Sequence, residues 1–550
     1  MQFGALVRGG EIYDGLGGPP LQADVGLTGD RITAIGDLSR RHAHVEIDAR
    51  GLAVAPGFIN CLSWATESLL VDSSAESDVR QGVTLEVFGE GSSMGPLTPS
   101  MKQDLIARQG GLRFDIEWTT LGEYLELLER RGVVPNVASF VGATTVRIHE
   151  LGYANRAPDA AELERMCALV RAAMREGALG VGSALIYTPG AYAGPAELLA
   201  LASVAAESGG GYITHLRSET NGVLAAVDEL LAIAAATRAH AEIYHLKVAG
   251  SANWHRLDDV LTRIEAARDE GLDVSANMYP YIAAATGFDA AMPPWVQEGG
   301  HEAWLARLRD PATRARVVRE IAGSGEQWEN LYAAAGSPEH LVLTGFRSDA
   351  LRRYRGMTLG QVARERSRSP EETIVDLVLE DGSRVIVAYF LMSEDNVRRQ
   401  LALPWVSLCS DEEALAPRGV FLAQHPHPRA YGAFARFLGR YVRDEKVTTL
   451  PEAIQRLTSL PARNFRLRDR GRIAPGCYGD VVVFDPRDVA DHATYDEPHR
   501  FASGVAHVLV NGQIVLRDGK MTGARPGRFV RGPGRAPARQ SAPILPKAAG

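Results

Sequence analysis

Two short segments, Gly211-Tyr212-Ile213-Thr214-His215 and Ala241-Glu242-Ile243-Tyr244-His245, decide the fold of this chain and the place of its chemistry. Each is rich in β-branched or aromatic residues and ends in a histidine, which is typical of a buried strand that stops at a polar edge. If both are neighbouring parallel strands, their carboxyl ends lie at one edge of the sheet, where the two imidazoles converge. Such a pair can hold a metal ion, although hydrogen-bonded histidines at the edge of a core produce the same pattern.

Strand-like segments alternate with amphipathic helical segments through most of the chain. Helical periodicity is clear at residues 160–177 and 195–207, and each of these segments lies between two strand candidates. Repeated strand–helix units with short loops predict a parallel sheet, and about eight units predict a closed (β/α)8 barrel of the TIM type, an α/β fold. The strand candidates span residues 54–60, 84–89, 136–141, 179–184, 211–215, 240–245, 273–278, 385–390 and 406–410.

Short strands separated by tight turns occupy both ends of the chain. Asp14-Gly15 is a turn dipeptide near the start, and Asn511-Gly512 predicts a two-residue hairpin near the end. Neither set of strands is long enough to close a barrel alone, so we expect the two sets to share a sheet. We therefore predict a small discontinuous β-sandwich domain of residues 1–55 plus 470–531, with the barrel at residues 56–469.

The predicted barrel region is far longer than the roughly 250 residues typical of this fold, so it must contain an insertion. After Tyr281 the alternation lapses, and helical segments with Pro, Gly and Trp follow over about residues 283–349. An insertion this long over the carboxyl-terminal face of the barrel would act as a lid. Residues 532–550 contain few large apolar side chains, which predicts an extended or disordered tail.

The composition is that of an ordinary globular protein, with 45% hydrophobic and 23% charged residues among 550. A net charge of −8 provides no basic field for nucleic acid or an anionic membrane. No apolar stretch approaches the ~18 to 20 residues that span a bilayer, and the four scattered cysteines suggest no disulfide framework. The net charge therefore favours a small-molecule or peptide substrate, and the oligomeric state, including a homo-oligomer, stays open. Because no signal-peptide pattern is present, we expect a cytoplasmic protein.

A series of motifs follows in a characteristic order along the chain. These motifs are Ala55-Pro56-Gly57-Phe58-Ile59, Tyr187-Thr188-Pro189-Gly190-Ala191-Tyr192, His215, His245-Leu246-Lys247, Tyr279-Pro280-Tyr281, Ser410-Asp411 and His427-Pro428-Arg429-Ala430-Tyr431-Gly432. Together they resemble the amidohydrolase superfamily and, within it, the N-acyl-D-amino-acid deacylases, or D-aminoacylases. The resemblance runs from about residue 5 to residue 530 and implies a barrel whose strand-end histidines bind metal.

The chain departs from the superfamily pattern directly after the first barrel strand. Members usually have Asp-x-His-x-His there and bind one metal through its two histidines, whereas residues 60–64 of this chain place Leu62 and Trp64 at those positions. In D-aminoacylases a cysteine after the second strand joins the two strand-end histidines as a ligand, and the matching position here is Glu90. The resemblance therefore implies one Zn²⁺ per chain, held by Glu90, His215 and His245, although Glu90 also suits a turn.

Asp411 is the candidate general base. It follows the eighth-strand pattern at residues 405–410, and similar enzymes use this aspartate to take a proton from a metal-bound water and deliver it to the leaving amine. The dipeptide Ser410-Asp411 also suits the first position of a helix, which is its alternative role.

Lys247 is the first candidate for substrate binding. The basic residues are nearly all arginine, so a lysine two positions beyond a strand-end histidine suggests a need for a compact ammonium group. The resemblance assigns Lys247 to the α-carboxylate of the substrate; its alternative role is that of a solvated loop residue. Tyr279 can donate its hydroxyl to the same carboxylate or to the developing oxyanion. Weaker candidates for the wall of the pocket are Tyr192 and Arg217.

The residues and the resemblance together predict a metal-dependent hydrolase that cleaves N-acyl amino acids, in the D-series by resemblance, to a carboxylate and a free amino acid. A cyclic amidase that opens a hydantoin-like ring is the alternative enzyme, because related barrels do so with similar ligands. A non-catalytic binding protein is the alternative from another class, since the His-x-His pair is lost. The joint presence of His215, His245, Lys247 and Asp411 favours an enzyme.

Overall fold

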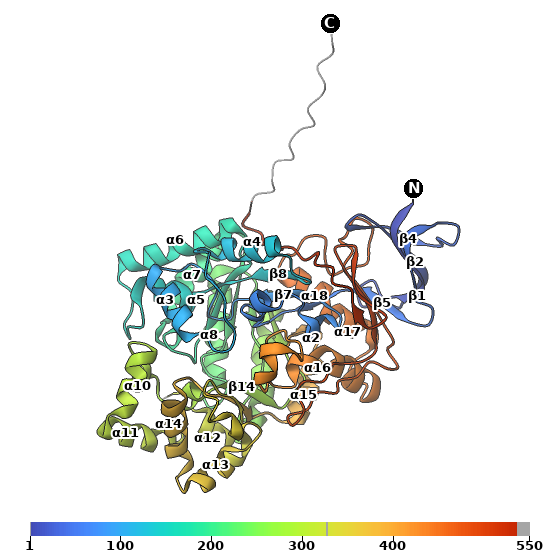
Figure 1. Cartoon of the computed structure of the whole chain (residues 1–550). Coiled ribbons are helices and arrows are strands. Elements are labelled where there is room, and N and C mark those ends of the chain that lie inside the picture. The colour runs from blue at the N-terminus through green and yellow to red at the C-terminus, as the bar shows by residue number, and fades with distance from the viewer. Residues whose placement is uncertain (1, 326–327, 536–550) are drawn as a thin grey trace.

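The computed structural model describes residues 2–325 and 328–535, and at its centre eight parallel strands form a closed barrel (Figure 1). One sheet has the strand order β17-β13-β12-β11-β10-β9, and a second has the order β6-β7-β8. The third barrel strand links the two sheets because β8 continues into β9, and the amide of Cys61 closes the barrel on the carbonyl of Leu408 at 3.4 Å. The strands are β6 (Phe58–Asn60), β7 (Val83–Phe88), β8 (Asn136–Ser139), β9 (Val141–Gly142), β10 (Gly180–Ala184), β11 (Gly211–His215), β12 (Ala241–Ile243), β13 (Val274–Met278) and β17 (Val406–Leu408).

Helices cover the outside of the barrel and follow the predicted periodicity. For example, α6 begins after Asp159, whose side chain accepts a hydrogen bond from the amide of Glu162, and it ends at Gly177, which has a φ of 119° that suits glycine. Among the described residues, no helix is both long and apolar enough to cross a bilayer. The covering helices include α5 (Ala143–Leu151), α6 (Ala160–Glu176), α7 (Pro195–Glu207), α8 (Val223–Thr237) and α9 (Leu257–Asp269).

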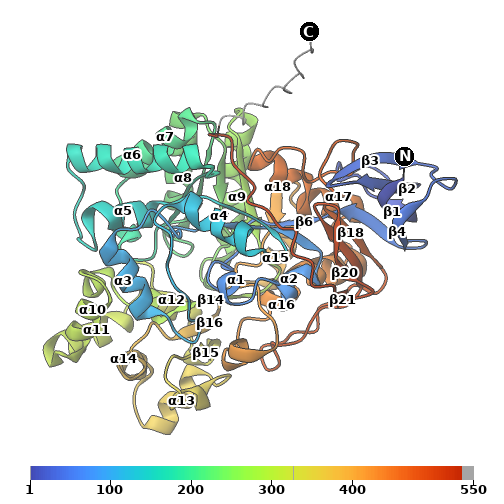
Figure 2. The same cartoon turned by 45° about the horizontal axis from the view of Figure 1, so that its top comes forward.

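Strands from both ends of the chain share one nine-stranded sheet beside the barrel (Figure 2). β5 joins the two sets, because it pairs in parallel with β1 and antiparallel with β18. The hairpin predicted at Asn511-Gly512 is present between β19 and β20. The domain boundaries themselves stay a prediction. The strands are β1 (Phe3–Ile12), β2 (Leu21–Thr28), β3 (Arg31–Gly36), β4 (Ala43–Asp48), β5 (Ala53–Pro56), β18 (Val481–Phe484), β19 (Val505–Val510), β20 (Gln513–Arg517) and β21 (Lys520–Met521).

The insertion is larger than predicted and contains a sheet of its own. β14 (Ala283–Gly287) and β15 (Leu341–Gly345) both pair antiparallel with β16 (Ile386–Phe390). The strand predicted at residues 385–390 therefore exists, but its assignment to the barrel was wrong, because an apolar run does not reveal its pairing partners. Five helices complete this region, which lies below the barrel in Figure 1: α10 (His301–Arg309), α11 (Pro311–Ile321), α12 (Leu331–Ala335), α13 (Leu359–Arg366) and α14 (Pro370–Asp381).

The last described residues run along the barrel strand β8. The amide of Val530 donates to the carbonyl of Val137 at 2.8 Å, and the amide of Val137 donates to the carbonyl of Arg528 at 2.9 Å. Gly532 continues the arm with a bond to the carbonyl of Gly177 at 2.8 Å. Most of the predicted tail, residues 536–550, lies outside the described residues.

Candidate metal centre and active site

Glu90, His215 and His245 form a buried group whose ligand atoms all lie within 4.8 Å of one another. His215 ends β11, while His245 and Glu90 follow β12 and β7, so all three stand at the carboxyl-terminal edge of the barrel. The two imidazole rings are 4.6 Å apart and nearly perpendicular, at 82°. Two imidazoles and one carboxylate form a donor set that zinc accepts, with a fourth position left for a water or a substrate.

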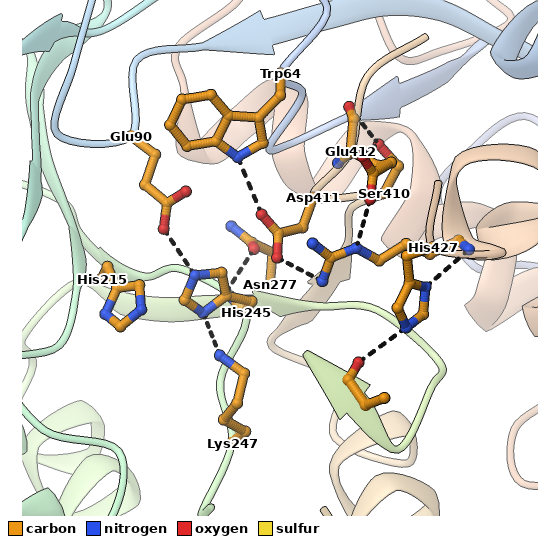
Figure 3. Close-up of polar contacts among 12 residues, drawn as sticks. Trp64, Glu90, His215, His245, Lys247, Asn277, Ser410, Asp411, Glu412 and His427 are labelled. Atoms are coloured by element: carbon orange, nitrogen blue, oxygen red, sulfur yellow. Dashed lines mark hydrogen bonds and ion pairs between the residues drawn. The ribbon is translucent and has the colours of Figure 1, made fainter. Parts of the chain in front are cut away.

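His245 lies between the carboxylate of Glu90 and the ammonium of Lys247 (Figure 3). Its Nε2 is 2.7 Å from Glu90 Oε1, and its Nδ1 is 2.6 Å from Lys247 Nζ and 3.1 Å from Glu219 Oε1. The amide of His245 donates to the side-chain oxygen of Asn277 at 2.9 Å, which fixes the turn that carries the ring. His245 has a φ of 34°, a conformation that costs free energy and that proteins retain mainly at functional positions.

Glu219 belongs to this cluster, although sequence reasoning did not select it. Its carboxylate accepts a hydrogen bond from Lys247 Nζ at 2.6 Å and lies 3.8 Å from His215 Nε2. A histidine that gives one ring nitrogen to a metal usually donates the other N–H to a carboxylate, and Glu219 is placed to accept it from His245. The only signal in the sequence was an acidic residue four positions after His215, in a loop.

The charges of the cluster suit a divalent cation. Burial and the Lys247 ammonium lower the pKa of His245, but three carboxylates outweigh both and raise that pKa to about 9; they belong to Glu90, Glu219 and Asp411. Burial raises the pKa of Glu219, yet Lys247 and the two histidines hold it well below its usual range. The cluster therefore combines ionised carboxylates with a proton on His245, and a cation can displace that proton.

Asp411 lies beside the metal-ligand group, in the loop after β17. Its Oδ1 accepts a hydrogen bond from the indole N–H of Trp64 at 3.2 Å, and its Oδ2 lies 2.7 Å from the guanidinium of Arg429 (Figure 3). Burial raises the pKa of Asp411, and Arg429 and His245 lower it only in part. Asp411 has a φ of 51° and is not a helix N-cap, so the alternative role considered from the sequence does not apply.

The sequence model of the amidohydrolase family matches residues 114–516. This chain belongs to the amidohydrolase family. An N-acyl-D-glutamate deacylase of Alcaligenes xylosoxydans xylosoxydans is 33% identical over 526 residues, which are 96% of each chain. A crystal structure of N-acyl-D-glutamate deacylase from Bordetella bronchiseptica, with zinc and a phosphonate mimic of the tetrahedral intermediate, shares 31% identity and a TM-score of 0.79 over 96% of this chain and all of the other.

A solved D-aminoacylase has the same similarity to this amidohydrolase, at 32% identity and a TM-score of 0.79 over 96% of this chain and all of the other. That D-aminoacylase has a binuclear metal centre, in which one metal activates the enzyme and the second attenuates it. The predicted amidohydrolase fold and the resemblance to D-aminoacylases are thereby confirmed.

Tyr279 of this amidohydrolase lies between two cations. Its ring centroid is 5.7 Å from Lys247 Nζ and 4.5 Å from the guanidinium carbon of Arg429. Its hydroxyl is buried and has no hydrogen-bond partner among the described residues. A buried hydroxyl without a hydrogen-bond partner costs free energy, so the Tyr279 hydroxyl is suited to form a hydrogen bond with a bound ligand. Arg429 was not selected from the sequence, although the motif His427-Pro428-Arg429 was a signal for it.

The polar atoms of Tyr192 and Arg217 are engaged in local structure. The hydroxyl of Tyr192 donates to the carbonyl of Pro294 at 2.7 Å, so it links the loop after β10 to the insertion. Arg217 forms an ion pair with Glu229 of α8 at 2.9 Å and donates to the carbonyl of Ala193 at 2.8 Å. These contacts favour a structural role for both residues over the substrate-binding role predicted for them.

Proposed function

We propose that this protein is a metal-dependent hydrolase that cleaves the amide bond of N-acyl amino acids, in the D-series, to a carboxylate and a free amino acid. The observation that carries the proposal is the buried group Glu90, His215 and His245 next to Asp411, at the edge of the barrel where such enzymes act. The similarity to N-acyl-D-amino-acid deacylases along nearly the whole chain supports the substrate class.

Glu90, His215 and His245 would hold one zinc ion. When bound there, zinc polarises the scissile carbonyl and lowers the pKa of the attacking water. Asp411 acts as the general base that removes a proton from that water, and it then delivers the proton to the leaving nitrogen. Glu219 Oε1 lies 3.1 Å from His245 Nδ1 and would accept a hydrogen bond from it when Nε2 binds the metal.

The cations around Tyr279 would hold the α-carboxylate of the substrate. Lys247 and Arg429 both face its ring, and its hydroxyl is free to donate to an anion. Lys247 pairs with Glu219 and Arg429 pairs with Asp411, so both cations are held in place beside the Tyr279 ring. Charge-assisted hydrogen bonds of this kind fix the orientation of the substrate as well as its affinity.

A panel of N-acyl-D- and N-acyl-L-amino acids, assayed for release of free amine, tests the proposal. We expect hydrolysis of D-substrates that requires about one zinc per chain, stops on chelation and returns when zinc is added back. A hydantoin in the same panel tests the cyclic amidase. A purified chain that binds no zinc, or that leaves every acyl amino acid intact with zinc bound, would refute the proposal.

A further inference from the structure

Trp64 stands at one of the two positions where the superfamily pattern has metal-ligand histidines. It is 37% exposed, whereas its neighbours Leu62, Ser63 and Ala65 are all buried. A tryptophan that served only to fill a core would be buried like these neighbours. The exposed indole lies at the active-site end of the barrel, beside Asp411 (Figure 3).

Main-chain hydrogen bonds hold the segments that carry Trp64 and Asp411 side by side. The amide of Trp64 donates to the carbonyl of Glu412 at 2.9 Å, and the amide of Asp411 donates to the carbonyl of Leu62 at 2.9 Å. These two bonds join the segment after the first barrel strand to the segment after the last one. Backbone pairing therefore brings Trp64 and Asp411 to neighbouring positions, from which the two side chains reach each other.

The indole N–H and a guanidinium together engage both oxygens of the Asp411 carboxylate. Trp64 Nε1 donates to Oδ1 at 3.2 Å, and Arg429 pairs with Oδ2 at 2.7 Å. An indole N–H can only donate, so it favours the ionised, proton-accepting form of the carboxylate and cannot coordinate a metal ion. A histidine at the same position could donate a hydrogen bond or bind a metal ion. Tryptophan in place of histidine therefore keeps the donor and removes the metal ligand.

We infer that Trp64 is a positioning residue: its indole N–H orients the Asp411 carboxylate in the place where two-metal relatives have a second ion, so this chain is a one-metal enzyme. The inference rests on the proposed function, because it takes Asp411 as the general base. In the described part of the chain, Glu90, His215 and His245 are the single group of three or more potential ligands that is compact enough for a metal.

The surroundings of Leu62 agree with this assignment. Leu62 is fully buried and has no atom that can bind a metal, and the side-chain Nδ2 of the nearby Asn60 lies within hydrogen-bond distance of Asp78, Glu86 and Ser410, at 2.8 to 3.2 Å. Asn60 thus links Ser410 to the buried carboxylates of Asp78 and Glu86. A second cation would find neither of the two imidazoles of the superfamily pattern on that side.

The variant Trp64→Phe tests the positioning role, because it keeps a six-membered aromatic ring and removes the N–H together with the pyrrole ring. A lost hydrogen bond to a charged group predicts a fall in kcat of about tenfold to a hundredfold with an unchanged KM. Trp295→Phe is the matched control, since its indole N–H also donates to a carboxylate, Glu320, at 2.7 Å, and we expect its kcat to match that of the wild type. Equal kcat values for the two variants would overturn the inference.

Two readouts do not depend on turnover. In the zinc-loaded protein, the ¹⁵N-indole resonance that disappears in Trp64→Phe should shift in Asp411→Asn, and an unshifted resonance would overturn the contact. Metal analysis in excess zinc should find one ion per chain in the wild type and in Trp64→Phe, and two in the double variant Leu62→His, Trp64→His. A second zinc in the wild type, or none gained by the double variant, would overturn the one-metal assignment. Both readouts remain decisive even if no substrate of the proposed class is hydrolysed.

Discussion

Replacing Glu219 by glutamine is expected to weaken zinc binding by about tenfold to a hundredfold while the fold is kept. The substitution preserves the size of the side chain and removes one negative charge from a buried cluster. Glu219 Oε1 lies 3.1 Å from His245 Nδ1 and accepts a bond from Lys247 Nζ at 2.6 Å. Glutamine therefore weakens the acceptor for the Nδ1 proton and leaves the Lys247 ammonium without its counter-charge beside the metal-ligand group.

The expected loss corresponds to about 1.4 to 2.7 kcal/mol of binding free energy. It is large because both partners of Glu219 are buried, at 3% and 4% exposure, so solvent screens the interaction little. Titration of the metal-free protein with zinc against a chromophoric chelator, at fixed pH, measures the affinity. The melting temperature of the metal-free variant checks that the fold is intact.

Glu197→Gln is the matched control for this experiment. Glu197 is as buried as Glu219, at 4% exposure, and pairs with a buried cation, Arg147, at 2.5 Å, but it lies away from the metal-ligand group. The control should keep the zinc affinity of the wild type even if its melting temperature falls. A zinc affinity of Glu219→Gln within twofold of the wild type would refute the role of Glu219 as the acceptor for His245.

Three further predictions follow from the site and its surroundings. Glu90→Ala should abolish stoichiometric zinc binding, whereas Glu90→Cys, which restores the ligand type of D-aminoacylases, should retain it by metal analysis. Lys247→Ala should raise KM for an acyl amino acid by about tenfold to a hundredfold, and an unchanged KM would exclude the carboxylate role. Burial lowers the pKa of His240, but Asp273 and Glu242 raise it to about 9, above an unfolded value of about 6.5. The stability that this contributes is fully present below pH 6.5 and is lost as the pH rises through 9, so the free energy of unfolding measured by chemical denaturation should decline between these values, and less steeply in His240→Gln.

Much of the architecture was predictable because its signals are local. Alternation of apolar runs with helical periodicity specifies a parallel sheet, and the turn at Asn511-Gly512 specifies a hairpin, without reference to distant residues. The strand at residues 385–390 was misassigned for the converse reason. Its apolar pattern suits a barrel strand and an antiparallel sheet equally, and its partners in β14 and β15 lie about 40 to 100 residues away along the chain.

The sequence by itself determined the strands and helices of the barrel and the residues that stand at strand ends, among them His215 and His245. It also determined that Leu62 and Trp64 replace the histidines of the superfamily pattern. Only the tertiary structure decided what these residues contact, because Trp64 reaches Asp411 across 347 positions of sequence and Glu90 reaches His245 across 155. Barrel closure brings the ends of separate strands to one edge, and no local pattern records which side chains meet there.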